Sequence, residues 1–287
     1  MSKLRPSFIH HSMRLASRDI HHPVPSRHSR GTATGILCSL MIASCLLFMP
    51  FATVSAQIGE HRNDLSVGIN GGYILSNVNF TPKVNQGYYG GMTAGLSFRY
   101  VCEKYFSTIC SVYAEINYAK IGWQEDILDV NDEPVINEYT GQAEEYKRSI
   151  TYIQIPIFAH LAWGREEKGF QFFFQAGPQL GFYMSESTET NFEFDQRNTT
   201  DRVSSIVAQD TMEVENKFDY GIAAGVGLEY SHPKIGHFLL EARYYYGLGN
   251  LYGDSKKDYF GTSRFGNIVI KVAYLFDITR TKKKEKK

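Results

Sequence analysis

The sequence predicts an all-β fold: an eight-stranded antiparallel up-and-down transmembrane β-barrel that follows a cleavable signal peptide. Three observations predict it. Eight runs alternate between apolar and polar residues from Asp64 onward. The connections between these runs alternate between long and short. The chain also starts with an export-type segment, and its 19 Tyr, 19 Phe and 25 Gly against 2 Trp are typical of strands with aromatic rings at a boundary.

The first 56 residues have the pattern of a signal peptide. A long basic region precedes an apolar run from Ile36 to Phe51, and Val54-Ser55-Ala56 then supplies the small residues of a cleavage site. The run is too short for a comfortable transmembrane helix. We therefore expect residues 1–56 to be removed after Ala56. No other segment is apolar and long enough to insert as a helix, which excludes a polytopic helical membrane protein.

Two alternatives concern this processing. Translation that starts downstream, at Met13, would give a signal of more usual length. Lipoprotein processing at Cys45 is disfavoured because the apolar run continues past it. On the main interpretation residues 57–63 form a short N-terminal lead, residues 64–279 the barrel and residues 280–287 a basic C-terminal tail.

The formal net charge of zero averages parts of opposite sign. The predicted signal carries six basic residues and one acid, and the tail carries six basic residues and one acid. The segment between them therefore has 18 basic and 28 acidic residues. A body this acidic offers no electrostatic footprint for nucleic acid.

The alternating runs are long enough for tilted strands to cross a bilayer, about 9–11 residues each. In the second run, Met92, Leu96 and Phe98 share one face, while Ser97 and Arg99 lie on the other. The predicted strands are 64–74, 88–101, 105–122, 148–163, 169–184, 217–230, 237–248 and 265–278.

The connections distinguish a membrane barrel from a soluble sandwich. The short connections are Cys102–Lys104, Gly164–Lys168 and Ser231–Gly236, and the long ones are 75–87, 123–147, 185–216 and 249–264. Outer-membrane barrels sort their loops in this way, whereas a sandwich has no reason to. Eight strands that close on themselves also leave no unpaired edge in lipid.

Aromatic residues on the predicted outward faces form two belts, as expected at the two headgroup levels. The alternative is that these rings are the core of a sandwich. The first belt, near the short turns, contains Tyr100, Phe106, Trp163, Phe172, Tyr230, Phe238 and Tyr274. The second, near the long loops, contains Tyr88, Tyr118, Phe182, Phe218 and Tyr246.

Five segments in order carry a family resemblance. They are Glu115-Ile116-Asn117-Tyr118-Ala119-Lys120-Ile121-Gly122, Tyr152-Ile153-Gln154-Ile155-Pro156-Ile157, Gln175-Ala176-Gly177-Pro178-Gln179-Leu180-Gly181-Phe182, Asp219-Tyr220-Gly221-Ile222-Ala223-Ala224-Gly225-Val226-Gly227-Leu228-Glu229 and Ala242-Arg243-Tyr244-Tyr245-Tyr246-Gly247-Leu248-Gly249-Asn250. Together they resemble the PorT-type outer-membrane β-barrel family of Bacteroidetes-type bacteria, over roughly residues 65–276. The resemblance implies an outer-membrane location and, by analogy with the family's namesake, a place in a protein-secretion apparatus. The basic tail departs from the family pattern.

Seven charged residues face the predicted lumen, which in an eight-stranded barrel is just wide enough for side chains to fill. Because unpaired buried charges are costly, we expect them to pair and close the barrel. A small diffusion channel is the alternative. The predicted luminal charge network consists of Arg99, Glu115, Asp219, Glu229, Glu241, Arg243 and Lys271.

The long loops 123–147 and 185–216 each hold eight acidic residues, against one and two basic residues respectively. We expect solvated, mutually repelling loops. Residues 129–133 could gather oxygen ligands for calcium, although they lack the glycine and distal glutamate of an EF-hand. The tail could contact an acidic periplasmic partner or phospholipid headgroups.

Catalytic and redox chemistry have little support in the sequence. None of the histidines of the predicted mature chain, His61, His160, His232 and His237, is placed with a serine and an acid at the outer rim, so we expect no enzyme and no cofactor. The predicted hairpin turn also places Cys102 far from Cys110, which predicts no disulfide between them. The sequence thus predicts a structural, ligand-binding or partner-binding protein embedded in outer-membrane lipid.

Overall fold

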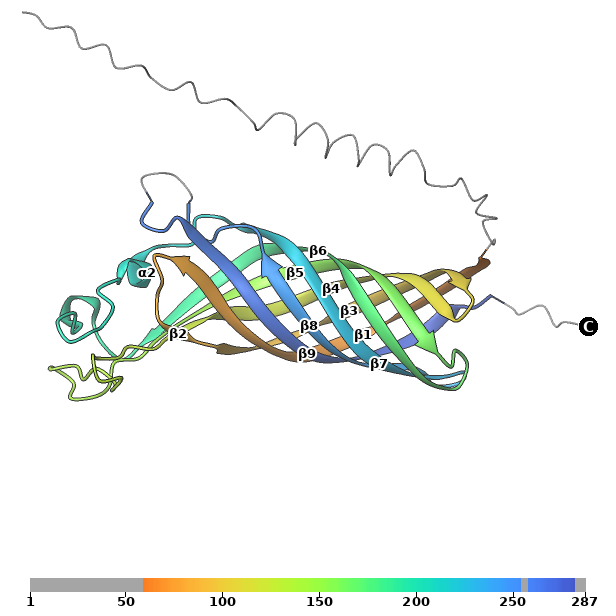
Figure 1. The fold of residues 1–287 in the computed structure, drawn as a ribbon, viewed down its shortest axis with the longest axis horizontal. Helices are drawn as coiled ribbons and strands as arrows, with labels where there is room; N and C mark the ends of the chain where they lie inside the picture. Colours follow the sequence, from red (N-terminus) through yellow and green to blue (C-terminus); the bar gives the residue numbers. More distant parts are fainter. Residues whose placement is uncertain (1–58, 254–257, 282–287) are drawn as a thin grey trace, which may run out of the picture. The chain divides into compact units, whose positions relative to one another are not determined.

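The computed structural model describes residues 59–253 and 258–281, which form a barrel of tilted antiparallel strands (Figure 1). The expected signal peptide and most of the basic tail lie outside these residues. The strands are β1 Glu60–Thr81, β2 Gln86–Gly87, β3 Tyr89–Tyr105, β4 Thr108–Glu125, β5 Tyr146–Gly164, β6 Gly169–Thr190, β7 Phe218–His232, β8 Gly236–Gly247 and β9 Thr262–Thr279. Two short helical segments, η1 Phe194–Gln196 and α2 Ala208–Thr211, lie between β6 and β7.

Eight of these strands close into a ring. The order is β4-β3-β1-β9-β8-β7-β6-β5, and β5 pairs back with β4. Every pairing in the ring is antiparallel, and the two-residue β2 extends the sheet beside the end of β4. The predicted eight-stranded barrel is therefore confirmed. In the described residues, no helix is long and apolar enough to cross a membrane.

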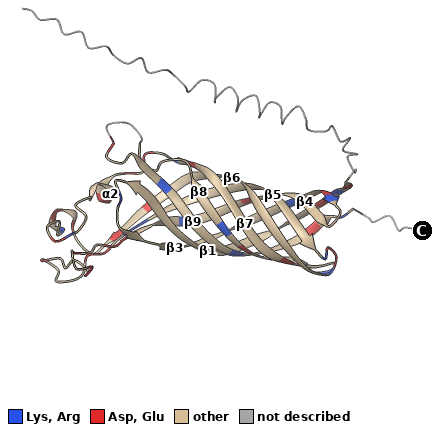
Figure 2. Cartoon of the chain, in the orientation of Figure 1, with Lys and Arg blue, Asp and Glu red and all other residues tan. Residues whose placement is uncertain are grey.

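The two faces of the wall follow the predicted alternation. On β3, Met92 and Leu96 point outward, with 73% and 50% of their surface exposed, while Ser97 and Arg99 are buried inside. Charged residues gather mainly at the two ends of the barrel, with fewer along the middle of the strands (Figure 2). The aromatic residues of both predicted belts are exposed or half-buried on the outer face rather than in a core, which contradicts the sandwich alternative.

Several strands are longer than predicted, and one turn is misplaced. β1 and β6 each run for 22 residues because their ends continue beyond the bilayer-spanning part into the long-loop region. The first hairpin turns at Phe106 and Ser107, between the paired Tyr105 and Thr108, and not at Cys102–Lys104.

The misplaced turn has a tertiary cause. Glu103 and Lys104 have the polarity of turn residues, yet the Lys104 ammonium lies 2.6 Å from the Glu166 carboxylate of the next short turn. Glu103 and Lys104 also pair with His61 and Glu60 of β1, so the segment continues as a strand. A bulge between Val101 and Glu103 accommodates the extra length.

Close approach of backbones in the wall requires glycine at Gly91. A Cβ there would lie 1.8 Å from the Lys120 carbonyl oxygen, whereas a Cβ on Gly71 would meet nothing closer than 3.7 Å. We predict that Gly91→Ala lowers the free energy of unfolding by about 1–3 kcal/mol, because the wall must shift to admit the methyl group. The matched Gly71→Ala should change it by less than about 1 kcal/mol. Urea unfolding in lipid vesicles, followed by heat-modifiable electrophoretic mobility, measures both; equal effects would contradict the prediction.

Candidate functional site

The middle of the lumen is occupied by a charge network from three strands. Arg243 on β8 donates to both oxygens of Glu115 on β4, at 3.0 and 3.2 Å, and to both oxygens of Glu241, at 2.6 and 3.0 Å. Lys271 on β9 donates to Glu115 from the other side. All four side chains are at most 4% exposed. Each cation thus has a carboxylate partner in a site that excludes solvent.

A second network lies nearer the short turns. Arg99 donates to both oxygens of Glu229, at 2.8 and 2.7 Å. The His237 ring bridges Glu229, 2.6 Å from Nδ1, and Asp277, 3.1 Å from Nε2. Sequence reasoning missed the last two residues, although both lie on the inward-facing parity of their strands, which was the signal available.

The second network also brings a serine to the histidine. The Ser231 hydroxyl lies 2.9 Å from His237 Nδ1, but it is completely buried, and Glu229 contacts the same ring nitrogen. A cavity of about 320 Å³ lies beside the second network. The Arg99–Glu229 pair and other charged residues of that network line it, but Ser231 does not. The serine therefore has no substrate space in front of it.

Asp219 does not join either network. Its carboxylate accepts a hydrogen bond of 2.7 Å from the Tyr245 hydroxyl, nearer the long loops. The seven predicted luminal residues are thus all buried in the barrel: six lie in the two networks, and Asp219 lies against the aromatic side chains described next.

Large aromatic side chains fill the lumen between the charge networks and the long loops. Neighbouring rings pack edge-on, stacked or tilted, with centroids 4.9–6.5 Å apart, the separation favoured by aromatic pairs. These rings close the barrel with apolar volume that the luminal charges alone did not reveal. This aromatic layer consists of Phe80, Trp123, Tyr146, Tyr152, Tyr245, Tyr252, Phe260 and Phe265, all at most 6% exposed.

The helical turn α2 lies across the aromatic layer as a plug. Gln209 is fully buried and donates to the Glu125 carboxylate at 2.8 Å. Its carbonyl oxygen accepts from Arg148 at 3.1 Å and from the Tyr252 hydroxyl at 3.3 Å. Arg148 also donates to the Met212 carbonyl and to Glu186. A loop from between β6 and β7 thus folds into the barrel mouth and is held there by strand residues.

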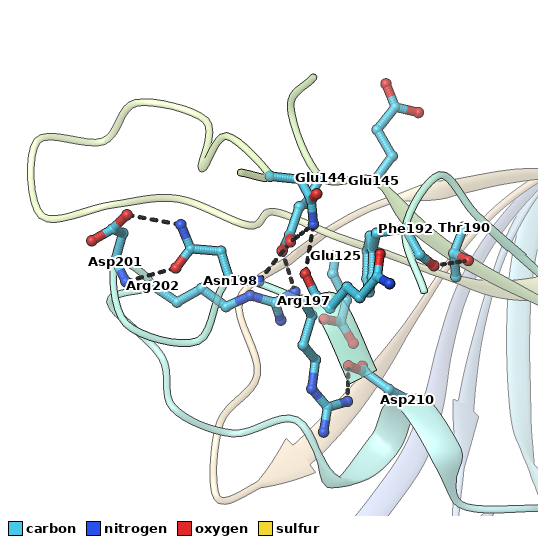
Figure 3. A network of polar contacts seen from close by, with 12 residues as sticks. Glu125, Glu144, Glu145, Thr190, Phe192, Arg197, Asn198, Asp201, Arg202 and Asp210 are labelled. Atoms are coloured by element: carbon cyan, nitrogen blue, oxygen red, sulfur yellow. Dashed lines mark hydrogen bonds and ion pairs between the residues drawn. The ribbon is translucent and has the colours of Figure 1, made fainter. Parts of the chain in front are cut away.

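The two acidic loops are ordered against one another, so the expectation of solvated, repelling loops is wrong for their inner acids. Arg202 lies 2.6 Å from Glu144, and Arg197 lies 3.1 Å from Asp210 (Figure 3). Asn198 donates its backbone N–H to Glu144 at 2.7 Å. The two arginines therefore point inward onto buried carboxylates, Glu125 is buried against Gln209, and most of the remaining acids are exposed.

In residues 129–133, the segment considered for calcium, the Asp129 carboxylate bonds backbone groups of the segment itself. Asp129 accepts hydrogen bonds from the backbone N–H groups of Asn131 and Glu133, at 2.7 and 2.9 Å. These bonds lower the pKa of Asp129 and close a turn. Within residues 59–253 and 258–281, no three metal-ligating side chains gather into a group that could hold an ion.

Comparison with known proteins identifies the family. A model described as an outer membrane protein beta-barrel domain matches residues 55–253, so the chain belongs to that family. The protein is therefore an outer-membrane β-barrel, with short turns expected on the periplasmic side and long loops outside. None of the curated proteins matches the chain.

Solved structures of outer-membrane proteins are similar at low identity. Ail of Yersinia pestis, in complex with the heparin analogue sucrose octasulfate, is 15% identical over 75% of this chain and 99% of its own, with a TM-score of 0.32. OprG from Pseudomonas aeruginosa is 13% identical over 76% and 98%, with a TM-score of 0.34. Neisserial surface protein A is 11% identical over 74% and 97%, with a TM-score of 0.35.

Removing the shared carboxylate of the central network should be costly. We predict that Glu115→Gln destabilises the barrel by about 3–5 kcal/mol, because Lys271 and Arg243 stay buried with less compensating charge. Glu145→Gln is the control, since Glu145 pairs with Lys147 at the surface and is 61% exposed; its loss should cost at most about 1 kcal/mol. Urea unfolding in lipid vesicles tests both, and a near-neutral Glu115→Gln would contradict the role of the network.

The plug should loosen as the pH rises. Burial raises the pKa of Asp210 and that of the neighbouring Glu125, the latter to about 8, so folding favours the protonated forms of this pair despite Arg197. The stability that this provides is complete below the ordinary aspartate pKa of about 4 and is lost as the pH rises through the raised value. Hydrogen-exchange protection of residues 205–212, corrected for intrinsic rate, should therefore be higher at pH 5 than at pH 8. Asp210→Asn should reduce this difference, whereas the exposed Glu213→Gln should keep it; pH-independent protection in the wild type would contradict the prediction.

Proposed function

We propose that this protein is a closed, non-enzymatic barrel that acts by binding a partner or ligand through its extracellular loops. One observation carries the proposal: the lumen is obstructed at successive levels. The Glu115–Arg243–Lys271 network fills its middle, the aromatic layer lies above, and α2 covers the mouth. A solute would have to break buried ion pairs to pass.

The outer surface of the loops supports a binding role. Val130 and Tyr139 are 83% and 72% exposed on a loop that is otherwise rich in carboxylates. The nearby Arg197 and Arg202 are turned inward onto Asp210 and Glu144. The outward face is therefore acidic with apolar side chains, which suits a basic partner surface.

The absence of catalysis is part of the proposal. The buried Ser231 and the position of His237 support it, because both ring nitrogens of His237 already contact carboxylates, which leaves no free nitrogen to take a proton from the serine. No cofactor is required by this function.

Reconstitution in planar lipid bilayers tests the proposal. We predict no stable single-channel steps from the purified barrel, because the central network spans the lumen. Glu115→Ala with Arg243→Ala, if the variant is heat-modifiable and therefore folded, should raise conductance above that of the wild type. Large, stable steps from the wild type would favour the alternative of a small diffusion channel.

The remaining alternative is a component of a secretion apparatus of the PorT type. Mild crosslinking of native outer membrane, followed by gentle extraction and mass spectrometry, distinguishes this alternative from the proposed loop-binding function. A stoichiometric periplasmic or outer-membrane assembly would favour the secretion role. Crosslinks confined to the loops after β4 and β6 would support binding of a partner through the extracellular loops.

A further inference from the structure

The two cysteines of the described residues lie on neighbouring strands at the bulge near the short turns. Cys102 is on β3 and Cys110 on β4, and both are half-buried free thiols. The sequence-based expectation that they are far apart assumed a turn at Cys102–Lys104 and is wrong. With the turn at Phe106 and Ser107, Cys110 lies opposite Glu103 and so beside Cys102.

The bulge places both thiols on one face. Val101 pairs with Ser111 and Glu103 with Cys110, so Cys102 is the extra residue and shares the single partner Cys110. Val101, Ile109 and Ser111 line the inner cavity, which turns Cys110 to the outside.

The pair is also within reach of the periplasm. Cys102 lies two residues beyond Tyr100 of the aromatic belt, toward the turn, and Cys110 lies two residues from the turn-side end of β4. These positions are at headgroup level or outside it. The bacterial periplasm is kept oxidising, and paired thiols there are commonly joined.

We propose that Cys102 and Cys110 are a modification site, joined after export by a cross-strand disulfide across the bulge. One thiolate attacks the disulfide of a periplasmic thiol oxidase, which forms a mixed disulfide. The second thiolate then displaces the oxidase thiolate. Two protons leave the cysteines, and the two electrons reduce the oxidase disulfide to a dithiol. The bond ties together the hairpin that carries the Lys104–Glu166 contact.

Tryptic peptides give a direct readout, because Lys104 separates the two cysteines. Mature protein from native outer membrane is alkylated at harvest and digested without reduction. Trypsin cuts after Arg99, Lys104 and Lys120 and yields peptides 100–104 and 105–120, each with one cysteine. We expect these two peptides to be joined, and to separate after reduction. Recovery of both as singly alkylated peptides would overturn the proposal, as would two copies of 105–120 joined to each other.

Unfolding provides a second test. Reductant should lower the thermal midpoint of the wild type by a few degrees, because the cross-link restricts the unfolded chain. The double variant Cys102→Ser/Cys110→Ser should have the lower midpoint and no response to reductant. Each single variant should leave one alkylatable thiol. A wild-type midpoint that ignores reductant while the linked peptide is absent counts against the site.

Discussion

The pairing of β5 with β4 closes the sheet, and the rest of the structure depends on it. In hydrocarbon, every backbone N–H and C=O must be satisfied within the protein, and a sheet achieves this only when it has no free edge. The ring order with its β4–β5 closure meets that requirement. Closure with eight strands also sets a lumen just wide enough for side chains to fill, so the inward-facing residues must pack together and pair.

The contents of the lumen follow from this geometry. A carboxylate such as Glu115 cannot be hydrated there, so it accepts from Arg243 and Lys271 together. Where no cation is available, as at Asp219, a phenol donates instead. Rings of the aromatic layer then occupy the volume that charges leave. The charges of the two networks are matched by opposite charges, and the remaining space is filled with apolar volume, which favours the folded barrel.

The two long loops, 123–147 and 185–216, differ from the lumen because they contain far more acidic than basic residues. Their arginines are placed where carboxylates are buried, at Glu144 and Asp210, Gln209 donates to the buried Glu125, and most of the other acids remain in water (Figure 3). This arrangement packs into one rim two segments that composition alone describes as repelling. It also allows α2 to lie in the mouth of the barrel, because Arg148 and tyrosine hydroxyls donate hydrogen bonds to its carbonyl groups. The resulting rim presents an ordered acidic surface to the exterior.

Alternation and loop lengths by themselves determined the strand number, the antiparallel order and which residues of each strand face inward, Arg99 and Lys271 among them. These are local properties, because the side chains of a strand alternate with period two and the face exposed to lipid must be apolar. Only the tertiary structure decided the shear between distant strands, and with it that Glu229 meets Arg99 and His237, and that Glu144 meets Arg202. It also decided the bulge that brings Cys102 to Cys110, because that segment is kept extended by pairing with β1 and contacts Glu166, 62 residues from Lys104 in the chain.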